Sequence, residues 1–163
     1  MKILSPAKIN LFLQVTGKRP DGYHELFSLM CCLTLVDKIS LQFDTEKIEI
    51  DSSHPRIPRD ESNLAYRAAD LFFKSLKITA GVKISIQKNI PVAAGLGGGS
   101  SNAASILRGL NYHYGHPFSR HQLMSLGLSL GADVPFLLHQ KPALVSGIGE
   151  NLEAYSGWLP DTV

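Results

Sequence analysis

The feature that most constrains this chain is a glycine-rich segment between a predicted strand and a predicted helix. Glycines occupy positions 95, 97, 98 and 99, after the strand pattern of residues 82–87 and before the helical pattern of residues 102–110. Glycine lacks a Cβ, so its backbone can adopt positive φ and approach a ligand closely. The first N–H groups of a helix lack partners within it and lie at the positive end of its dipole. The segment therefore predicts a site for an anion, most commonly phosphate.

The charge distribution supports an anion site here. Residues 71–132 contain no Asp or Glu, and the whole chain carries a net charge of only +2. Acids are thus kept out of one region, whose local field should attract a polyanion. The basic residues of this acid-free run are Lys74, Lys77, Lys83, Lys88, Arg108 and Arg120.

Asp133 ends the acid-free run and is a candidate for chemistry. Capping of a helix that begins near Pro135 explains Asp133 equally well. Lys88 ends the strand that leads into the glycine segment, so it is placed to meet an anion. The spacing around Lys8 is that of an exposed strand lysine.

Length and composition restrict the class of protein. A chain of 163 residues, 44% hydrophobic and 18% charged, fits one folded domain. The small net charge argues against a nucleic-acid-binding protein. Cys31 and Cys32 are adjacent, so on a strand they point to opposite faces and do not pair readily. Without a signal sequence or a membrane-spanning apolar run, we expect a reducing, cytoplasmic location.

The order of the predicted elements favours an α+β fold, since strands come first and helices mixed with strands follow. Residues 7–15 alternate, which predicts a strand whose core face holds Ile9, Leu11, Leu13 and Val15. A β-rich stretch over residues 26–43, split near Asp37, and a short strand over residues 47–51 come next.

The second half of the chain is predicted to contain three helices and two strands. Ser62 is the predicted cap of a helix that extends to about residue 76, and residues 82–87 form a strand. After the helix at the glycine segment, residues 112–118 form a loop. Ser119 and Gln122 fit a capping box for a helix that ends near Gly131. Residues 142–148 form the last strand.

The glycine segment matches none of three common motifs. No Gly-Lys-Ser or Gly-Lys-Thr closes it, the glycine spacing is not that of a dinucleotide fingerprint, and Ser100 is not followed by x-Gly. A flexible turn is less favoured, because a turn alone does not need three consecutive glycines and two serines at a helix N-terminus. Ser100 and Ser101 either bind phosphate or metal-bound water, or cap the helix.

Two other groups of residues have alternative interpretations. The segment from Asp21 to Glu25 is either a surface turn or a platform that stacks on a base through Tyr23 and His24. The histidines at positions 113, 116 and 121 fit no metal-binding spacing, which favours a solvated loop.

Several separated segments together resemble the GHMP kinase superfamily. They are Ser5-Pro-Ala-Lys8-Ile-Asn10-Leu, residues 91–104, residues 127–135 and Asp21-Gly-Tyr-His24. The first and the last of these segments look like the branch that phosphorylates a diphosphocytidyl sugar alcohol. The resemblance implies an α+β domain with a mixed sheet and helices packed on one side, similar to the second domain of ribosomal protein S5. The whole chain, residues 1–163, would be the N-terminal, ATP-binding domain.

The resemblance also implies that the C-terminal domain of these kinases is absent from this chain. An exposed apolar face is then expected where that domain would dock.

The resemblance implies two catalytic residues, Lys8 and Asp133. Asp133 would accept the proton of the substrate hydroxyl, and Lys8 would hold Asp133 ionised and stabilise charge on the attacking oxygen. The residues that would hold the cytidine diphosphate end of the substrate are Asn10, Tyr23 and His24.

The implied cofactors are ATP and Mg²⁺, with no residue assigned to the metal. Asn63 and Lys88 would lie near the nucleotide. The residues that match the phosphate loop are Pro91, Val92, Ala93, Ala94, Gly95, Leu96, Gly97, Gly98, Gly99, Ser100 and Ser101.

The implied partner is a small molecule, diphosphocytidyl methylerythritol, whose 2-hydroxyl is phosphorylated in non-mevalonate isoprenoid synthesis; no nucleic acid or membrane is implied. One alternative is another kinase of the superfamily, acting on mevalonate or homoserine, although these substrates do not need the aromatic residue Tyr23. A second alternative is a non-catalytic α+β module that binds RNA or a protein, which the near-neutral net charge disfavours.

Overall fold

One mixed six-stranded sheet organises the molecule. The computed structural model describes residues 1–20, 22 and 24–157. The long strands β1 (Lys2–Lys18) and β2 (His24–Gln42) form an antiparallel hairpin. Along its other edge, β2 pairs antiparallel with β5 (Ala143–Gly147) through residues 26–30 and with β4 (Val82–Gln87) through residues 38–42. The outer strands β3 (Ile48–Ser52), parallel to β4, and β6 (Asn151–Ala154), antiparallel to β5, complete the sheet.

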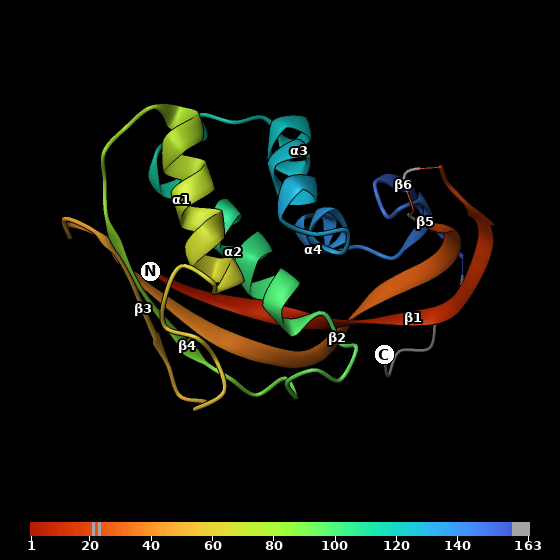
Figure 1. Cartoon of the computed structure of the whole chain (residues 1–163), viewed down its shortest axis with the longest axis horizontal. Helices are drawn as coiled ribbons and strands as arrows, with labels where there is room; N and C mark the ends of the chain where they lie inside the picture. The colour runs from red at the N-terminus through yellow and green to blue at the C-terminus, as the bar shows by residue number, and fades with distance from the viewer. Residues whose placement is uncertain (21, 23, 158–163) are drawn as a thin grey trace.

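The helices cover one face of this sheet (Figure 1). They are α1 (Leu64–Leu76), α2 (Gly98–His113), α3 (Arg120–Leu130) and α4 (Val134–His139). Helix α1 connects the parallel strands β3 and β4, as a parallel pair requires. The predicted α+β fold, with a mixed sheet and helices on one side, is therefore confirmed. No helix of the described residues is long and apolar enough to span a membrane.

Helix α2 has ten buried residues and packs directly on the sheet. Small side chains such as Ala103 and Ala104 are fully buried along it. At Gly109, a Cβ atom would lie 2.6 Å from Ile3 Cδ1 and 2.9 Å from Leu41 Cδ1, so only glycine permits this close approach. The N-terminus of α2, with the glycine segment before it, is thereby held against β1 and β2.

The predicted core face of β1 is wrong. Ile9, Leu11, Leu13 and Val15 are 36, 41, 58 and 59% exposed, whereas Lys8 is only 7% exposed. The register shifts between Asn10, opposite Met30, and Phe12, opposite Leu29, so Leu11 is an extra residue. The bulge does not by itself explain the exposure, because Ile9 before it and Leu13 and Val15 after it are all exposed. No described element covers these side chains, and an apolar/polar pattern does not reveal that.

Three predicted boundaries also need correction. Strand β2 is not split near Asp37; the register with β1 shifts instead between Pro6 and Lys8, opposite β2 residues 32–36. The cap of α1 is Asn63 and not Ser62, because the Asn63 side chain accepts a hydrogen bond from Ala65 N. Helix α2 continues to His113, into the segment predicted as a loop. The Ser119 capping box and the strand at residues 82–87 are confirmed.

Candidate active site

The glycine segment forms one wall of a groove at the N-terminus of α2. The groove has a volume of about 370 Å³, and its other wall is the segment that leads into α1. Positive φ angles at Ala93 (61°), Gly95 (75°) and Gly97 (66°) turn the chain sharply between β4 and α2. Gly97 caps α2 without a side-chain hydrogen bond, so the first N–H groups of the helix are not satisfied by a cap. These groups favour an anion in the groove.

Gly97 also places the glycine segment against Lys8 of β1. A Cβ atom on Gly97 would lie 2.8 Å from Lys8 Cγ, so a larger residue would displace the lysine. The Lys8 backbone N–H donates to the carbonyl of Leu96 over 3.0 Å. The buried position of Lys8 thus results from this packing, which is a tertiary contact that the sequence pattern of β1 does not contain.

Lys8, which packs against Gly97, forms an ion pair with Asp133. Lys8 Nζ lies 3.3 Å from Asp133 Oδ2, with 9% of the lysine side chain and 37% of the aspartate side chain exposed. Asp133 occupies the N-cap position of α4, but its side chain makes no capping hydrogen bond. Of the two interpretations of Asp133, the geometry favours a carboxylate that faces Lys8 over a side-chain cap.

Asn10 fixes the position of the Lys8 ammonium group. Lys8 Nζ donates to Asn10 Oδ1 over 2.7 Å, and Asn10 Nδ2 donates to Ser28 Oγ over 2.7 Å. The Ser28 hydroxyl in turn donates to the carbonyl of Phe12 at the bulge. This chain of hydrogen bonds connects the two strands of the hairpin, and its member Ser28 was not recognised in the sequence.

Asn63 and Lys88 both line the groove, as expected for residues near a nucleotide. Asn63 is nevertheless occupied by structural bonds, since Oδ1 caps α1 and Nδ2 donates to the Pro58 carbonyl. Lys88 donates to the buried carboxylate of Asp37 and, over 3.2 Å, to Asn102 Oδ1. Of the six basic residues of the acid-free run, only Lys88 lines the groove.

The two serines of the segment differ in their surroundings. Ser101 is fully buried, and its hydroxyl accepts a hydrogen bond from Ser5 over 2.8 Å. Ser100 is half-buried and lines the groove. The side chain of Ser100 is therefore the better placed of the two to contact a ligand.

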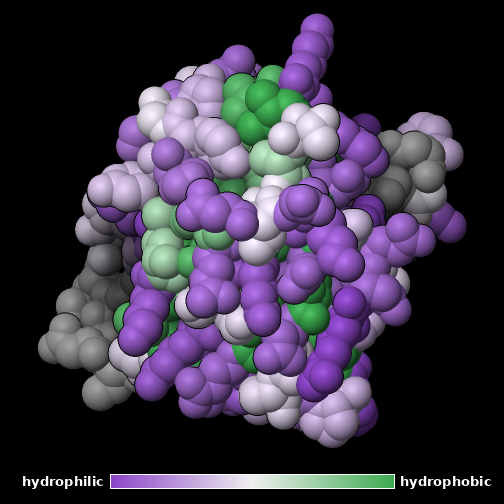
Figure 2. Space-filling model, turned by 90° about the vertical axis from the view of Figure 1, so that its left-hand side faces the viewer, coloured by the Kyte–Doolittle hydropathy of each residue, from purple (hydrophilic) through white to green (hydrophobic). Residues whose placement is uncertain are grey.

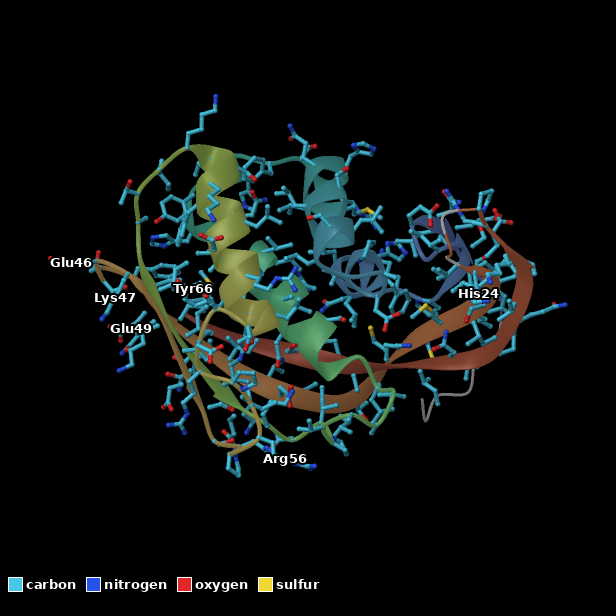
Figure 3. All side chains as sticks on the ribbon, viewed as in Figure 1. His24, Glu46, Lys47, Glu49, Arg56 and Tyr66 are labelled. Carbon is cyan, nitrogen blue, oxygen red and sulfur yellow. The ribbon has the colours of Figure 1, made fainter. Side chains whose placement is uncertain are left out.

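The remaining predicted substrate residues are not brought to Lys8 and Asp133 by the structure. His24 is exposed and pairs with Lys18 at the tip of the β1–β2 hairpin (Figure 3). Asn10 pairs with Met30, six residues along β2, which corresponds to roughly 20 Å of strand. Tyr23 lies outside the described residues.

Sequence reasoning missed one charged residue of this region, Asp37. It is fully buried below the glycine segment and pairs with Lys88. An acid inside an apolar strand pattern was interpreted as a break in the strand, although burial of a carboxylate normally requires such a partner. That requirement is the signal that could have identified it.

The arrangement suits the transfer of a phosphoryl group. The groove offers backbone N–H groups and one end of a helix dipole to phosphates, while Lys8 supplies a positive charge and Asp133 a partly exposed carboxylate. Phosphoryl transfer depends mainly on alignment and on neutralisation of charge on the oxygens. Within the described part of the chain, no three His, Cys, Asp or Glu side chains form a metal-binding group.

Comparisons with known proteins agree with this chemistry. Residues 63–141 match the family described as "GHMP kinases N terminal domain". The chain is 49% identical over 158 residues to the 4-diphosphocytidyl-2-C-methyl-D-erythritol kinase of Syntrophotalea carbinolica, covering 96% of this chain and 56% of the relative. It is 45% identical over 163 residues to the enzyme of that name from Clostridioides difficile, covering 99% of this chain and 55% of the relative. The chain thus spans about half the length of the curated relatives it matches.

Solved structures show the same relationship. The crystal structure of a 4-(cytidine 5'-diphospho)-2C-methyl-D-erythritol kinase matches with a TM-score of 0.81 and 40% identity, over 95% of this chain and 55% of that chain. Mevalonate kinase from Methanococcus jannaschii matches with a TM-score of 0.72 over 96% of this chain and 56% of that chain. Its identity of 17% shows a shared fold alone.

Proposed function

The chain belongs to the GHMP kinase family and matches the N-terminal domain of that family. From this premise we propose that the protein is an ATP-dependent kinase. The proposed reaction is phosphorylation of the 2-hydroxyl of 4-diphosphocytidyl-2-C-methyl-D-erythritol, in non-mevalonate isoprenoid biosynthesis. The observation that carries the proposal is the ion pair of Lys8 and Asp133 beside the glycine-lined groove. It unites a phosphate site, a cation and a carboxylate in one place.

The residues present fit the triphosphate of ATP. None of the described residues that line the groove is an Asp or Glu, so no lining carboxylate would repel a triphosphate. The charged residue of the lining is Lys88, which is paired with Asp37. The predicted phosphate loop, residues 91–101, contributes all its members except Ser101 to this lining. Mg²⁺ would accompany ATP and be bound largely by the phosphates and by water, because Mg²⁺ in such sites usually keeps several of its waters.

Lys8 and Asp133 have complementary roles in the proposed reaction. Asp133 Oδ2 would accept the proton of the attacking hydroxyl, and Lys8 would stabilise the negative charge that develops on the oxygens. Asn10 holds Lys8 Nζ through a 2.7 Å hydrogen bond, so the ammonium group is oriented before substrate binds. Orientation of this kind lowers the barrier without any new covalent chemistry.

The substrate is proposed from the printed names of the relatives and from the hairpin motif. Both curated relatives described above carry a name that specifies the diphosphocytidyl substrate. We assign Asn10, Tyr23 and His24 to its cytidine diphosphate end, which requires substrate to extend from Lys8 toward the hairpin tip. A mevalonate- or homoserine-type substrate would leave the hairpin tip without a ligand.

A panel assay tests this proposal. ADP release would be measured for the full-length protein with ATP and each of three alcohols: diphosphocytidyl methylerythritol, mevalonate and homoserine. The proposal requires turnover with the first alcohol only. Turnover with one of the others would establish a different GHMP kinase, and salt-sensitive RNA binding without ATP binding would establish a binding module.

A further inference from the structure

Among the described residues, Asp37 is the buried carboxylate, and it is hydrogen-bonded to residues on either side of the glycine segment. Asp37 of β2 is completely inaccessible to solvent and accepts hydrogen bonds from four donors. Oδ1 accepts from the backbone N–H groups of Asn89 and Ile90, over 2.8 and 2.9 Å. Oδ2 accepts from Lys88 Nζ and, over 3.0 Å, from Asn102 Nδ2. Its oxygens are therefore fully used by one short region of the chain.

The donors to Asp37 come from both ends of the glycine segment. Asn89 and Ile90 precede the segment, and Asn102 lies in the first turns of α2, which follows it. One carboxylate thereby sets the distance between the two ends of residues 91–101. The same Asn102 amide donates to Ser5 Oγ over 3.1 Å, which connects this cluster to β1 three residues before Lys8.

Asp37 also determines where the charge of Lys88 lies. A Cβ on Gly98 would lie 3.2 Å from Lys88 Nζ, so the ammonium group sits directly against the first residue of α2. Asp37, which lines no part of the groove, and Asn102, which does line it, hold the ammonium group there. The lysine cannot leave this position without leaving the Asp37 carboxylate unpaired in the interior, which is strongly unfavourable.

We propose that Asp37 is a positioning residue for nucleotide binding, which fixes Lys88 and both ends of the phosphate loop in the geometry that the phosphates require. The inference rests on the proposed function, since it takes the groove to be a phosphate site. It predicts that loss of the Asp37 charge weakens nucleotide binding by loosening the loop, although Asp37 itself lines no part of the groove. A carboxylate that served only global stability would affect all parts of the fold alike.

The test compares three variants of this chain with the wild type. Asp37→Asn keeps the shape of the side chain and removes its charge. The double variant Asp37→Asn/Lys88→Met removes both charges and is included because a single unpaired lysine can prevent folding. Ile50→Val, at a buried site of the core away from the loop, is the control for a general loss of stability.

Two measurements are made well below the melting temperature of each variant. Amide hydrogen exchange of residues 89–99 reports on the loop without any nucleotide, and calorimetric titration with a non-hydrolysable ATP analogue and Mg²⁺ reports on affinity. We expect exchange in the loop to be at least tenfold faster in both Asp37 variants, and affinity at least tenfold weaker in Asp37→Asn. Ile50→Val should change neither quantity by more than about twofold.

The outcomes separate the inference from the function on which it rests. Unchanged loop exchange in a folded Asp37 variant, or analogue affinity of Asp37→Asn within twofold of wild type, would overturn the role of Asp37. If Asp37→Asn does not fold, exchange in the double variant decides. If the wild-type chain does not bind the analogue, the proposed function fails, while loop exchange still decides whether Asp37 holds the segment.

Discussion

At the scale of single residues, the chemistry of the site depends on Lys8 and Asp133. Lys8→Ala and Asp133→Asn in the full-length protein should each lower kcat by about 10²- to 10⁴-fold, because they remove charge stabilisation or a proton acceptor. The dissociation constant for ATP should change by less than about threefold, because both groups act on the transferring phosphoryl group. Steady-state kinetics and calorimetric titration measure the two quantities.

The matched control for these variants is Asp70→Asn. Asp70 belongs to an exposed ion pair with Lys74 on α1, away from the groove lining. Its removal should leave both kcat and nucleotide affinity unchanged. Equal losses of ATP affinity in Lys8→Ala and Asp133→Asn would contradict the roles assigned to them.

Gly97 and Gly99 should respond in opposite directions to the same substitution. Gly97→Ala should lower the free energy of unfolding by about 1–2 kcal/mol, because φ is +66° and the new Cβ would lie 2.8 Å from Lys8 Cγ. Gly99→Ala should raise it by up to about 1 kcal/mol, because Gly99 is helical and its Cβ would meet no atom within 4 Å. Urea unfolding measures both, and equal effects would refute the account of Gly97.

The thiol of Cys32 should react slowly at neutral pH. Burial raises its pKa from the ordinary value of 9.0 to about 11, with a contribution from Cys31, while Arg108 acts in the opposite direction. Iodoacetamide labelling of the native chain at pH 8 should be roughly tenfold slower than for the denatured chain, after allowing for the greater nucleophilicity of a basic thiolate.

The pH dependence of this labelling gives the sign of the shift. The native rate should be half-maximal near pH 11, whereas the rate of an unperturbed thiol is half-maximal near pH 9. Because the folded pKa is raised, the thiol's contribution to stability is present below pH 9 and is lost as the pH rises from about 9 to 11. A native rate that is half-maximal near pH 9 would show that Cys32 is not desolvated.

At the scale of elements, α3 depends on its N-terminal cap. Leu123 and Gly127 are its buried residues, and Leu126 and Leu130 pack against the core while only partly buried, so its packing is less extensive than that of α2. Ser119 and Gln122 form a reciprocal capping box, with bonds of 3.3 and 2.8 Å. Ser119→Ala should therefore lower the free energy of unfolding by about 1 kcal/mol.

Ser125→Ala on the same helix is the control for Ser119→Ala. The exposed Ser125 hydroxyl donates to the His121 carbonyl within the helix, and alanine has the higher helix propensity. Its replacement should leave stability unchanged or slightly higher. Similar losses for both serines would show that the cap adds nothing specific.

Elements governed by local sequence were predicted, and those governed by tertiary contacts were not. The capping box at Ser119 and the strand at residues 82–87 depend on neighbouring residues and are confirmed. The exposure of Ile9, Leu13 and Val15 on β1 depends on which elements cover the strand, and the pattern of β1 does not contain that information. The burial of Asp37 likewise depends on donors that all lie more than 50 residues away in the sequence. The nearest of them is Lys88.

The candidate site shows the same division. The groove wall at residues 91–100 was predicted from glycine and helix-start chemistry alone. The contact of Lys8 with Asp133 joins residues that are 125 positions apart. The local spacing around Lys8 is typical of an exposed strand lysine, and only the family resemblance pointed to the pair. The role of Ser28 in orienting Asn10 follows from strand register and has no signal within its own segment.

At the scale of the whole molecule, exposed apolar residues gather on β1. Leu11, Leu13 and Val15 lie on a strand with no partner along its outer edge among the described strands. The surface at the opposite end, over β3, β4 and α1, is largely hydrophilic (Figure 2). Apolar residues concentrated on one strand commonly mark an interface. We therefore expect this part of β1 to pack against the second half of the polypeptide that the longer relatives contain.

Replacing these residues should reduce the exposed hydrophobic surface and the self-association of the chain without unfolding it. Threonine favours strands as valine does, so Leu11→Thr/Leu13→Thr/Val15→Thr should keep the hairpin while removing apolar surface. We expect lower binding of a hydrophobic fluorescent dye and less self-association in analytical ultracentrifugation. Leu4→Thr, at an equally exposed position near the start of β1, is the control and should have a smaller effect. Unchanged dye binding in the triple variant would place the apolar interface elsewhere, because the buried core of an interface is more apolar than the rest of the surface.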